Sequence, residues 1–293
     1  MNTAPYRCVH HSSGRSHAAE MALVLTAVGI ENFLAQSEDG WQVYVDQEAY
    51  GTALAQLALY QQENSAPRIR RPRYTTIDSG WYGVLGYLGI IWLLPAAQSF
   101  VEPSLLGAGR LQAALVGQGE WWRAITALTL HADLAHIASN SLFGALFGLF
   151  VGRHMGSGLG WLLVLLSATV ANLINAGIQP DRFSAIGAST ATFAAMGMVP
   201  AFGWRRGYFR GSGGLREFAP LFGALALLSF TGFGGERVDM MGHVLGFIMG
   251  VGTGLAAASY RFEKHSIADQ QRAGAFAVFL VVTAWVIALR VAE

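Results

Sequence analysis

The 293-residue chain contains little charge and almost no cysteine. Charged residues make up 13% of it, about half the share of an ordinary soluble domain, whereas hydrophobic residues reach 53%. Such a composition excludes a soluble globular enzyme and excludes intrinsic disorder. The formal net charge of +1 provides no strong field for nucleic acid, so no nucleic-acid partner is expected. The composition therefore predicts a membrane protein whose surroundings include the lipid bilayer.

Cysteine occurs once, as Cys8, which excludes an intramolecular disulfide and a cysteine-based zinc site. The first residues, MNTAPYRCVHHSSGRSH, lack the apolar core of a signal peptide. Insertion into a membrane is therefore expected to depend on the hydrophobic spans themselves.

The composition changes abruptly near residue 75, and the part before it is typical of a small soluble domain. Strand-like and helix-like stretches alternate there in the order β-α-β-β-α, with the helices expected around 18–28 and 49–62. We expect an α/β domain over residues 1–66. A linker rich in proline and arginine follows over 67–79, and its arginines suit a position next to a membrane.

Seven later stretches are apolar enough to cross a hydrocarbon core of ~30 Å, which takes about 20 helical residues. They lie near 81–100, 134–153, 157–178, 187–204, 217–233, 238–258 and 273–291. The first six form a predicted six-helix core over 80–258, and residues 259–293 supply a loop and a seventh span. The predicted fold class is therefore mainly α, a polytopic membrane helical bundle preceded by the α/β domain.

The basic residues predict the orientation of these spans. Lys264 is the only lysine, and the arginines are distributed unevenly between alternate loops. Twelve of the 19 basic residues lie on one side of the seven spans and five lie on the other. The positive-inside rule then places the N-terminal domain in the cytoplasm and the C-terminus outside, in a cell (inner) membrane.

Polar residues gather at the starts of three even-numbered spans, which all run from outside to inside. These residues are His131, His136 and Asn140 at the second span, Ser189 at the fourth, and His243 at the sixth. Polar groups in a span are costly and by default mark function. Each lies within roughly 10 Å of the external surface at about 1.5 Å per residue. A serine and a histidine at matching depth can act as nucleophile and general base.

Preorganised donors for an oxyanion are also predicted near this serine. Asp133 is a good N-cap, which places His136 in the first helical turn and Asn140 on the same face one turn later. Their side chains and the Ser189 N–H at a helix N-terminus are candidates to stabilise developing negative charge.

Small residues predict that the serine and histidine helices approach closely. Glycines recur every fourth residue along the sixth span, and small residues do so along the fourth. Such ridges let backbones meet in lipid. The two rows are Gly242, Gly246, Gly250 and Gly254, and Gly187, Ala191 and Ala195. We expect the two rows to form one seam that carries His243 toward Ser189.

Four motifs combine these residues: Trp122-Arg123, then His131-x4-His136-x3-Asn140, then Gly187-Ala-Ser189, then Gly242-His243-x-x-Gly246. In this order they resemble the rhomboid family of intramembrane serine proteases. The resemblance covers roughly residues 80–258, and the seventh span is similar to the extra C-terminal helix of some members.

The resemblance implies a Ser189–His243 dyad without a catalytic aspartate. It also implies an oxyanion hole formed by His136, Asn140 and the Ser189 amide, with His131 and Gly187 as supporting residues. Family members cleave transmembrane protein substrates at small residues near the membrane surface, and they need no metal or cofactor. A loop at roughly 231–238 would cap the water-filled cavity.

One position departs from the family pattern, because Thr190 stands where many members have glycine. A β-branched side chain there is expected to narrow the pocket or shift substrate preference, without removing a catalytic group.

Other interpretations remain open at this point. The main alternative is a catalytically silent rhomboid-like protein that binds or escorts membrane proteins, although such proteins typically lack the serine or the histidine. A small transporter is disfavoured because no internal repeat is found and the polar cluster is near one surface. A metal site is disfavoured because His131 and His136, at i and i+5, do not share a helical face. The natural substrate, oligomeric state and role of the N-terminal domain stay undetermined.

Weaker expectations concern isolated polar residues. His154 and His265 are expected in cytoplasmic loops, whereas Asn172 and Asn175 are expected to form interhelical hydrogen bonds.

Overall fold

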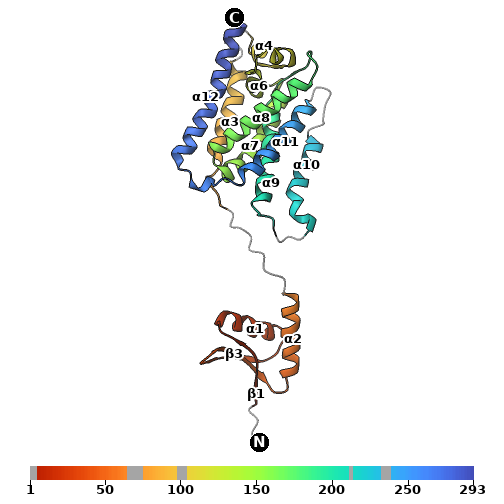
Figure 1. Ribbon diagram of the computed structural model, residues 1–293, viewed down its shortest axis with the longest axis vertical. Helices are drawn as coiled ribbons and strands as arrows, with labels where there is room; N and C mark the ends of the chain where they lie inside the picture. Colours follow the sequence, from red (N-terminus) through yellow and green to blue (C-terminus); the bar gives the residue numbers. More distant parts are fainter. Residues whose placement is uncertain (1–4, 65–74, 98–103, 211–213, 232–238) are drawn as a thin grey trace. The chain divides into compact units, whose positions relative to one another are not determined.

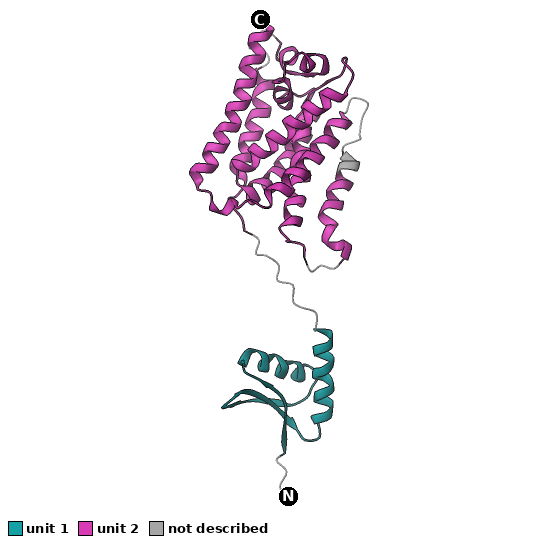
Figure 2. Ribbon diagram, in the orientation of Figure 1, with its two compact units in different colours: residues 1–70 teal, residues 71–293 magenta. Residues whose placement is uncertain are grey.

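The computed structural model describes residues 5–64, 75–97, 104–210, 214–231 and 239–293. The chain forms two compact units, Met1–Arg70 and Arg71–Glu293 (Figure 2). Residues 75–79, predicted to belong to a linker, pack on the second unit. The Ile77 N–H donates to the Arg153 carbonyl oxygen at 2.8 Å, and the Asp78 carboxylate accepts hydrogen bonds from Ser157.

Unit 1 has the predicted element order, strand, helix, two strands and helix (Figure 1). Its elements are β1 (Tyr6–Ser12), α1 (Arg15–Ala27), β2 (Asn32–Ser37), β3 (Gly40–Asp46) and α2 (Tyr50–Glu63). The sheet is antiparallel in the order β1-β3-β2. Val43 and Val45 of the central strand are fully buried with Leu25 of α1 and Leu57 of α2, since alternate strand residues point to one face.

Unit 2 is a helical bundle with short elements between its first two long helices (Figure 1). The long helices are α3 (Trp81–Ala97), α7 (Leu134–Met155), α8 (Leu159–Ile178), α9 (Ser189–Arg205), α10 (Ala219–Thr231), α11 (Met240–Ala257) and α12 (Ile267–Ala292). The short elements between α3 and α7 are α4 (Leu105–Gly109), β4 (Leu111–Gln112), α5 (Ala113–Gly117), α6 (Arg123–Thr126) and η2 (Ala127–Thr129). Three more follow later in the chain, β5 (Ser184–Ala185), η3 (Gly214–Phe218) and η4 (Phe262–Lys264).

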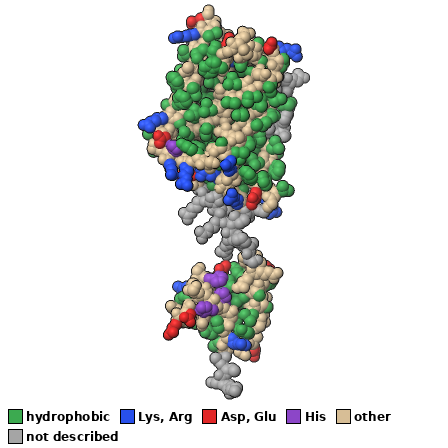
Figure 3. All heavy atoms as spheres, viewed as in Figure 1, with side chains coloured by type: hydrophobic (Ala, Val, Ile, Leu, Met, Phe, Trp, Pro, Cys, Tyr) green, Lys and Arg blue, Asp and Glu red, His purple; other side chains and the backbone are tan. Residues whose placement is uncertain are grey.

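Four helices in the described part of the chain are long and apolar enough to cross a membrane, namely α7, α8, α11 and α12. The apolar helix α3 has 17 residues, and α9 and α10 have 17 and 13 described residues. The seven-span count therefore stays a prediction. Figure 3 shows hydrophobic side chains over the middle of unit 2 and charged side chains at its two ends, the distribution expected of a bundle that spans a bilayer.

The glycines reveal a close seam between α9 and α11. A Cβ added at Gly246 would lie 2.5 Å from the Thr190 carbonyl oxygen. Added Cβ atoms at Gly250 and Gly254 would overlap the carbonyl oxygens of Ala194 and Met198. Because both numberings increase along the seam, the two helices run parallel and their N-termini lie at the same end.

The register of this seam differs from the expected one. The row on α9 that faces the glycines is Thr190, Ala194 and Met198, whereas the predicted row was Gly187, Ala191 and Ala195. Ala191 and Ala195 instead belong to a core with residues of α7 and α8. The physical reason is that both faces of α9 are buried, so small residues alone did not distinguish which face meets α11.

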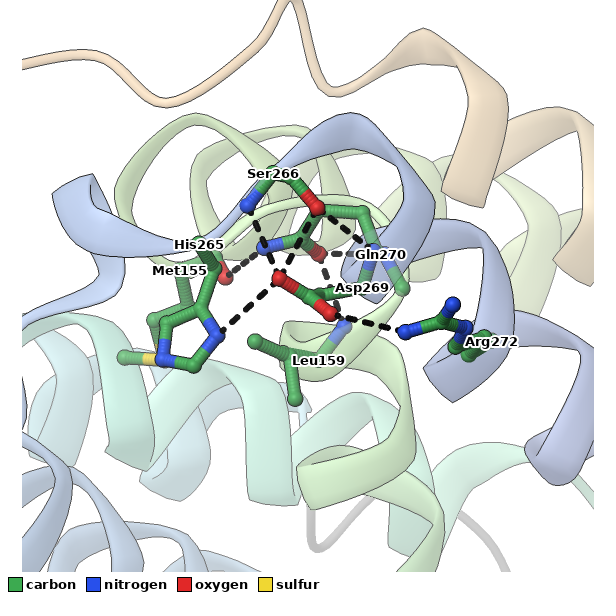
Figure 4. Close-up of polar contacts among 8 residues, drawn as sticks. Met155, Leu159, His265, Ser266, Asp269, Gln270 and Arg272 are labelled. Carbon is green, nitrogen blue, oxygen red and sulfur yellow. Dashed lines mark hydrogen bonds and ion pairs between the residues drawn. The ribbon is translucent and has the colours of Figure 1, made fainter.

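One glutamine attaches the N-terminal end of the C-terminal helix α12 to the bundle (Figure 4). Oε1 of Gln270 accepts hydrogen bonds from the N–H groups of Gly158 and Leu159 at 3.0 and 2.9 Å, and its Nε2 donates to the Met155 carbonyl oxygen. These contacts satisfy backbone groups where α7 ends and α8 begins. A capping box of Ser266 and Asp269 starts α12 at Ile267, six residues before the predicted span.

The expectation for His154 was wrong. It lies in the last turn of α7 with its side chain buried, and its ring packs against those of Phe202 and Tyr208 at 5.6 and 5.9 Å. His265 does lie in the connection before α12. The expectation for the asparagines is confirmed for Asn172, whose Nδ2 donates to the Ala124 carbonyl oxygen in α6 at 2.9 Å.

We predict that Gly250→Ala destabilises the protein by about 1–3 kcal/mol, because the added methyl group meets the Ala194 backbone, which cannot move away alone. Gly252→Ala is the matched control, since a Cβ there meets nothing within 4 Å. The control is expected to be neutral or slightly stabilising because alanine favours helix more than glycine does. Thermal unfolding in detergent measures both, and equal melting temperatures would contradict the close seam.

Candidate active site

The start of α7 carries the first polar cluster. Asp133 is the N-cap, as predicted, and its Oδ1 accepts a hydrogen bond from the His136 N–H at 2.8 Å. Asp133 lies three residues before His136, so His136 is in the first turn of the helix and Asn140 is one turn further on. The Ala132 N–H lies 3.5 Å from Nδ1 of His136, so this nitrogen acts as the acceptor and Nε2 carries the ring proton.

Asn140 is buried, with 5% of its surface exposed. Nδ2 has no hydrogen-bond partner among the described residues. The backbone of Asn140 is held from α3, because the Tyr87 hydroxyl donates to its carbonyl oxygen at 2.9 Å. A buried donor without a partner is costly and calls for an explanation, of which a catalytic role is one.

The segment before Ser189 is fixed by backbone contacts on both sides. β5 pairs with β4, and the Gly187 N–H donates to the Ala127 carbonyl oxygen at 2.9 Å. The Ala188 N–H donates to Nε2 of His131 at 3.4 Å. Ser189 is the first residue of α9, so its N–H has no partner within the helix and stands at the positive end of the helix dipole.

Gly187 places the ring of His136 beside the hydroxyl of Ser189. Its φ of +133° is a conformation that residues with side chains rarely adopt. A Cβ at Gly187 would lie 2.7 Å from Cε1 and Nε2 of His136 and 3.5 Å from Oγ of Ser189. Both groups therefore border the same small volume, which only a glycine leaves open.

His131 supports this arrangement from the loop before α7. Its ring lies 5.1 Å from that of His136 at 71°, an edge-to-face contact. Burial, and secondarily the neighbouring His136, lower the pKa of His131 to about 4. The ring is therefore neutral at pH 7, as it must be to accept the Ala188 hydrogen bond.

His243 lies in the first turn of α11 and is 7% exposed. The N-cap of this helix is Asp239, whose carboxylate accepts hydrogen bonds from the Gly242 N–H at 2.9 Å and from Nδ2 of Asn175 at 2.7 Å. The ring of His243 packs on that of Phe193 at 4.4 Å. The Gly246 contact with Thr190 lies one turn further along the same seam, so His243 and Ser189 both lie at its N-terminal end.

Thr190 is buried in the seam. Its carbonyl oxygen and Cγ2 are the atoms nearest to Gly246, and its side chain is 4% exposed. The added methyl group relative to glycine thus packs between α9 and α11.

Three residues of this region were not singled out from the sequence. Phe193 follows Ser189 by four residues on one helical face, a spacing that could have identified it. Asp239 is an acidic residue three positions before Gly242, which is a recognisable N-cap signal. Tyr87 is one tyrosine in an apolar helix, and no local pattern marks its contact with α7.

Arg123, from the predicted Trp122-Arg123 motif, holds the connection between α3 and α7 together. It is 6% exposed and donates to the carbonyl oxygens of Gly107 and Arg110 at 3.2 and 2.9 Å and to the Glu120 carboxylate. A buried charge needs this number of partners. The predicted capping loop falls largely on residues 232–238, which lie outside the described residues.

Across the described ranges, no three His, Cys, Asp or Glu side chains converge in a way that could hold a metal ion.

Comparison with known proteins identifies a rhomboid domain at residues 118–260. Rhomboid protease GluP of Bacillus subtilis (strain 168) is 32% identical over 190 residues, which cover 64% of this chain and 34% of that protein. Rhomboid-like protease 1 of Toxoplasma gondii is 31% identical over 166 residues, covering 56% of this chain and 54% of that protein. The chain thus spans about a third to about half of the length of these relatives.

The residues that the four motifs contribute, from Trp122 to His243, all lie inside the matched domain. Several apolar helices accompany them, which makes the chain a multi-pass membrane protein. The motifs, the helical bundle and the matched domain agree, and the chain contains a rhomboid domain.

Proposed function

We propose that this protein is an intramembrane serine endopeptidase that cleaves transmembrane protein substrates, with Ser189 as nucleophile and His243 as general base. The observation that carries the proposal is the buried amide nitrogen of Asn140, which has no hydrogen-bond partner among the described residues and lies one turn after His136, whose ring is beside the Ser189 hydroxyl. A donor left unsatisfied in the free protein is available for an oxyanion that forms only during reaction.

The reaction follows from the chemistry of the two side chains. His243 takes the hydroxyl proton as Oγ of Ser189 attacks the substrate carbonyl carbon, and the carbonyl oxygen becomes negatively charged. Nε2 of His136, Nδ2 of Asn140 and the Ser189 N–H donate hydrogen bonds to that oxygen. His243 then protonates the leaving amine, and water hydrolyses the acyl-enzyme by the same route in reverse.

Packing takes the role that a catalytic aspartate has in a triad. Phe193 contacts one face of the His243 ring, and the Asp239 cap fixes the turn from which this ring projects. Both contacts reduce the number of ring orientations, which is the entropic part of positioning a base.

The basic residues support a cytoplasmic N-terminal domain and an active site near the external face of the inner membrane. Substrates would then enter from the bilayer and be cleaved near its outer surface.

We predict that Ser189→Ala abolishes proteolysis of a model transmembrane substrate and labelling by a fluorophosphonate probe. His243→Ala is expected to lower both by at least about 10³-fold, because the hydroxyl is a weak nucleophile without its base. Gel-based labelling in detergent measures this, with Gly252→Ala as a control that leaves the site intact. A wild type that neither labels nor cleaves any substrate of a panel would favour the silent, partner-binding alternative.

Asn140→Ala is predicted to lower kcat by about 10²–10³-fold with little change in KM, as expected for one lost oxyanion donor. The melting temperature should stay the same or rise, because the variant removes an unsatisfied buried amide. The matched control is Ser139→Ala, since Ser139 is exposed and its hydroxyl donates only to the His136 carbonyl oxygen among the described residues. A large fall in melting temperature at unchanged kcat would instead assign Asn140 a structural role.

The orientation is tested with epitope tags in intact cells. A tag at residue 2 is expected to resist external protease, whereas a tag after residue 293 is expected to be cleaved, because the arginine distribution favours these sides. Cleavage of the N-terminal tag alone would reverse the orientation and put the site near the cytoplasmic face.

A further inference from the structure

A groove that does not include Ser189 or His243 in its lining runs between α3 and α12. Its volume is about 760 Å³. Gly86 and Ile90 of α3 line one wall, Gly274 and Val278 of α12 line the other, and Trp161 of α8 lies between them. Gly86 faces open space, since a Cβ there would meet nothing within 4 Å. The groove thus lies between two of the predicted membrane spans.

The length of the groove indicates which class of ligand it can hold. Its lining on α12 extends from Ile267 to Val281, which is roughly 21 Å of helix. A long, mainly apolar lining of this kind suits a flexible hydrocarbon chain, which can follow the groove along the helix.

Polar groups gather at one end of the groove, and the other polar residues of the lining include Thr129, Tyr82 and Tyr87. At that end, His265, Ser266 and Gln270 of the α12 start meet Asp78 and Ser157, whereas the remainder of the lining is mainly apolar. The Asp78 carboxylate already accepts hydrogen bonds from Gly80 and Ser157. The groove therefore has the polarity of a lipid, with one polar end and a long apolar body.

Basic side chains stand beside this polar end. Lys264 and Arg272 immediately flank lining residues, namely His265 and Gln271, and both basic side chains belong to exposed residues. Arg272 contacts Asp269 at 3.4 Å, a surface ion pair that a phosphate can replace at little cost. Figure 3 shows Lys and Arg side chains gathered at one end of unit 2.

We propose that this groove binds one acyl chain of an anionic phospholipid, with the phosphate beside Lys264 and Arg272. An apolar cavity open to the bilayer fills with hydrocarbon, because lining atoms that face an empty space have no partners for dispersion contacts. The basic pair adds selectivity for a negative headgroup, about fivefold for each basic residue close to the membrane surface.

The occupant would contact residues that build the region around Ser189. The groove reaches Ala188, which precedes Ser189, and Tyr87, whose hydroxyl holds the backbone of Asn140. Lipid binding itself does not depend on proteolysis, so the test below has a readout independent of the proposed function.

The experiment uses phosphatidylcholine vesicles that contain a phosphatidylglycerol with a photoreactive acyl chain. Irradiation of the reconstituted wild type is expected to label peptides of α3 and α12. Gly86→Phe fills the groove and should lower that labelling by about tenfold. A second filling variant, Ala275→Phe on the opposite wall, should lower it to the same extent. The matched control is Gly89→Phe, on the same helix and also in open space, but outside the groove lining.

The proposal would be overturned by equal labelling in Gly86→Phe, Ala275→Phe and Gly89→Phe. The probe would then be reacting with the protein from the surrounding bilayer and not from the groove. Circular dichroism melting identifies any variant that fails to fold, and the other filling variant then decides. A model transmembrane substrate crosslinked in the groove in place of lipid would also overturn it.

The headgroup is tested by competition with unlabelled lipids. In the wild type, unlabelled phosphatidylglycerol should displace the probe better than unlabelled phosphatidylcholine does. This preference should disappear in the double variant Lys264→Gln/Arg272→Gln. Arg290→Gln, at the other end of α12, is the control and should keep it. Equal competition by both lipids in the wild type would overturn the anionic headgroup.

Discussion

The close parallel contact of α9 with α11 is the constraint on which the rest of the site depends. In lipid, helices gain little by hiding apolar surface from one another, so packing must supply the attraction. Glycines at 246, 250 and 254 allow the α11 backbone to reach the carbonyl oxygens of α9. Because the helices start at the same end, this contact brings the first turns of both helices together. Ser189 and His243 stand in these two turns.

The other side of the site depends on polar contacts rather than on small residues. Asp133 sets the start of α7, His131 fixes the backbone before Ser189, and Gly187 leaves room for the His136 ring. The unpaired amide of Asn140 remains buried within this framework. Among the described residues, this framework leaves the Asn140 nitrogen without a partner, so that it can serve as a donor where the proposed reaction develops charge.

Much of this architecture was predictable because local signals carry it. Asp133 is a strong N-cap, and the caps and apolar runs predicted the starts of α7, α8 and α11 within two residues. The row of α9 that meets α11 was not predictable, because both faces of that helix are buried and both carry small residues. His154 was wrongly predicted to lie in a loop, because a single histidine near a helix end belongs to no repeating pattern that would indicate burial.

The sequence by itself determined the resemblance to rhomboid proteases, the motif residues and their order, since these depend on composition and spacing along one chain. Only the tertiary structure decided that Phe193 covers the ring of His243, that Tyr87 holds Asn140 from α3, and that a groove lies between α3 and α12. These features join residues that are 50 to nearly 200 positions apart. Their contacts depend on how helices rotate and lean against one another, which side-chain packing sets and local spacing does not encode.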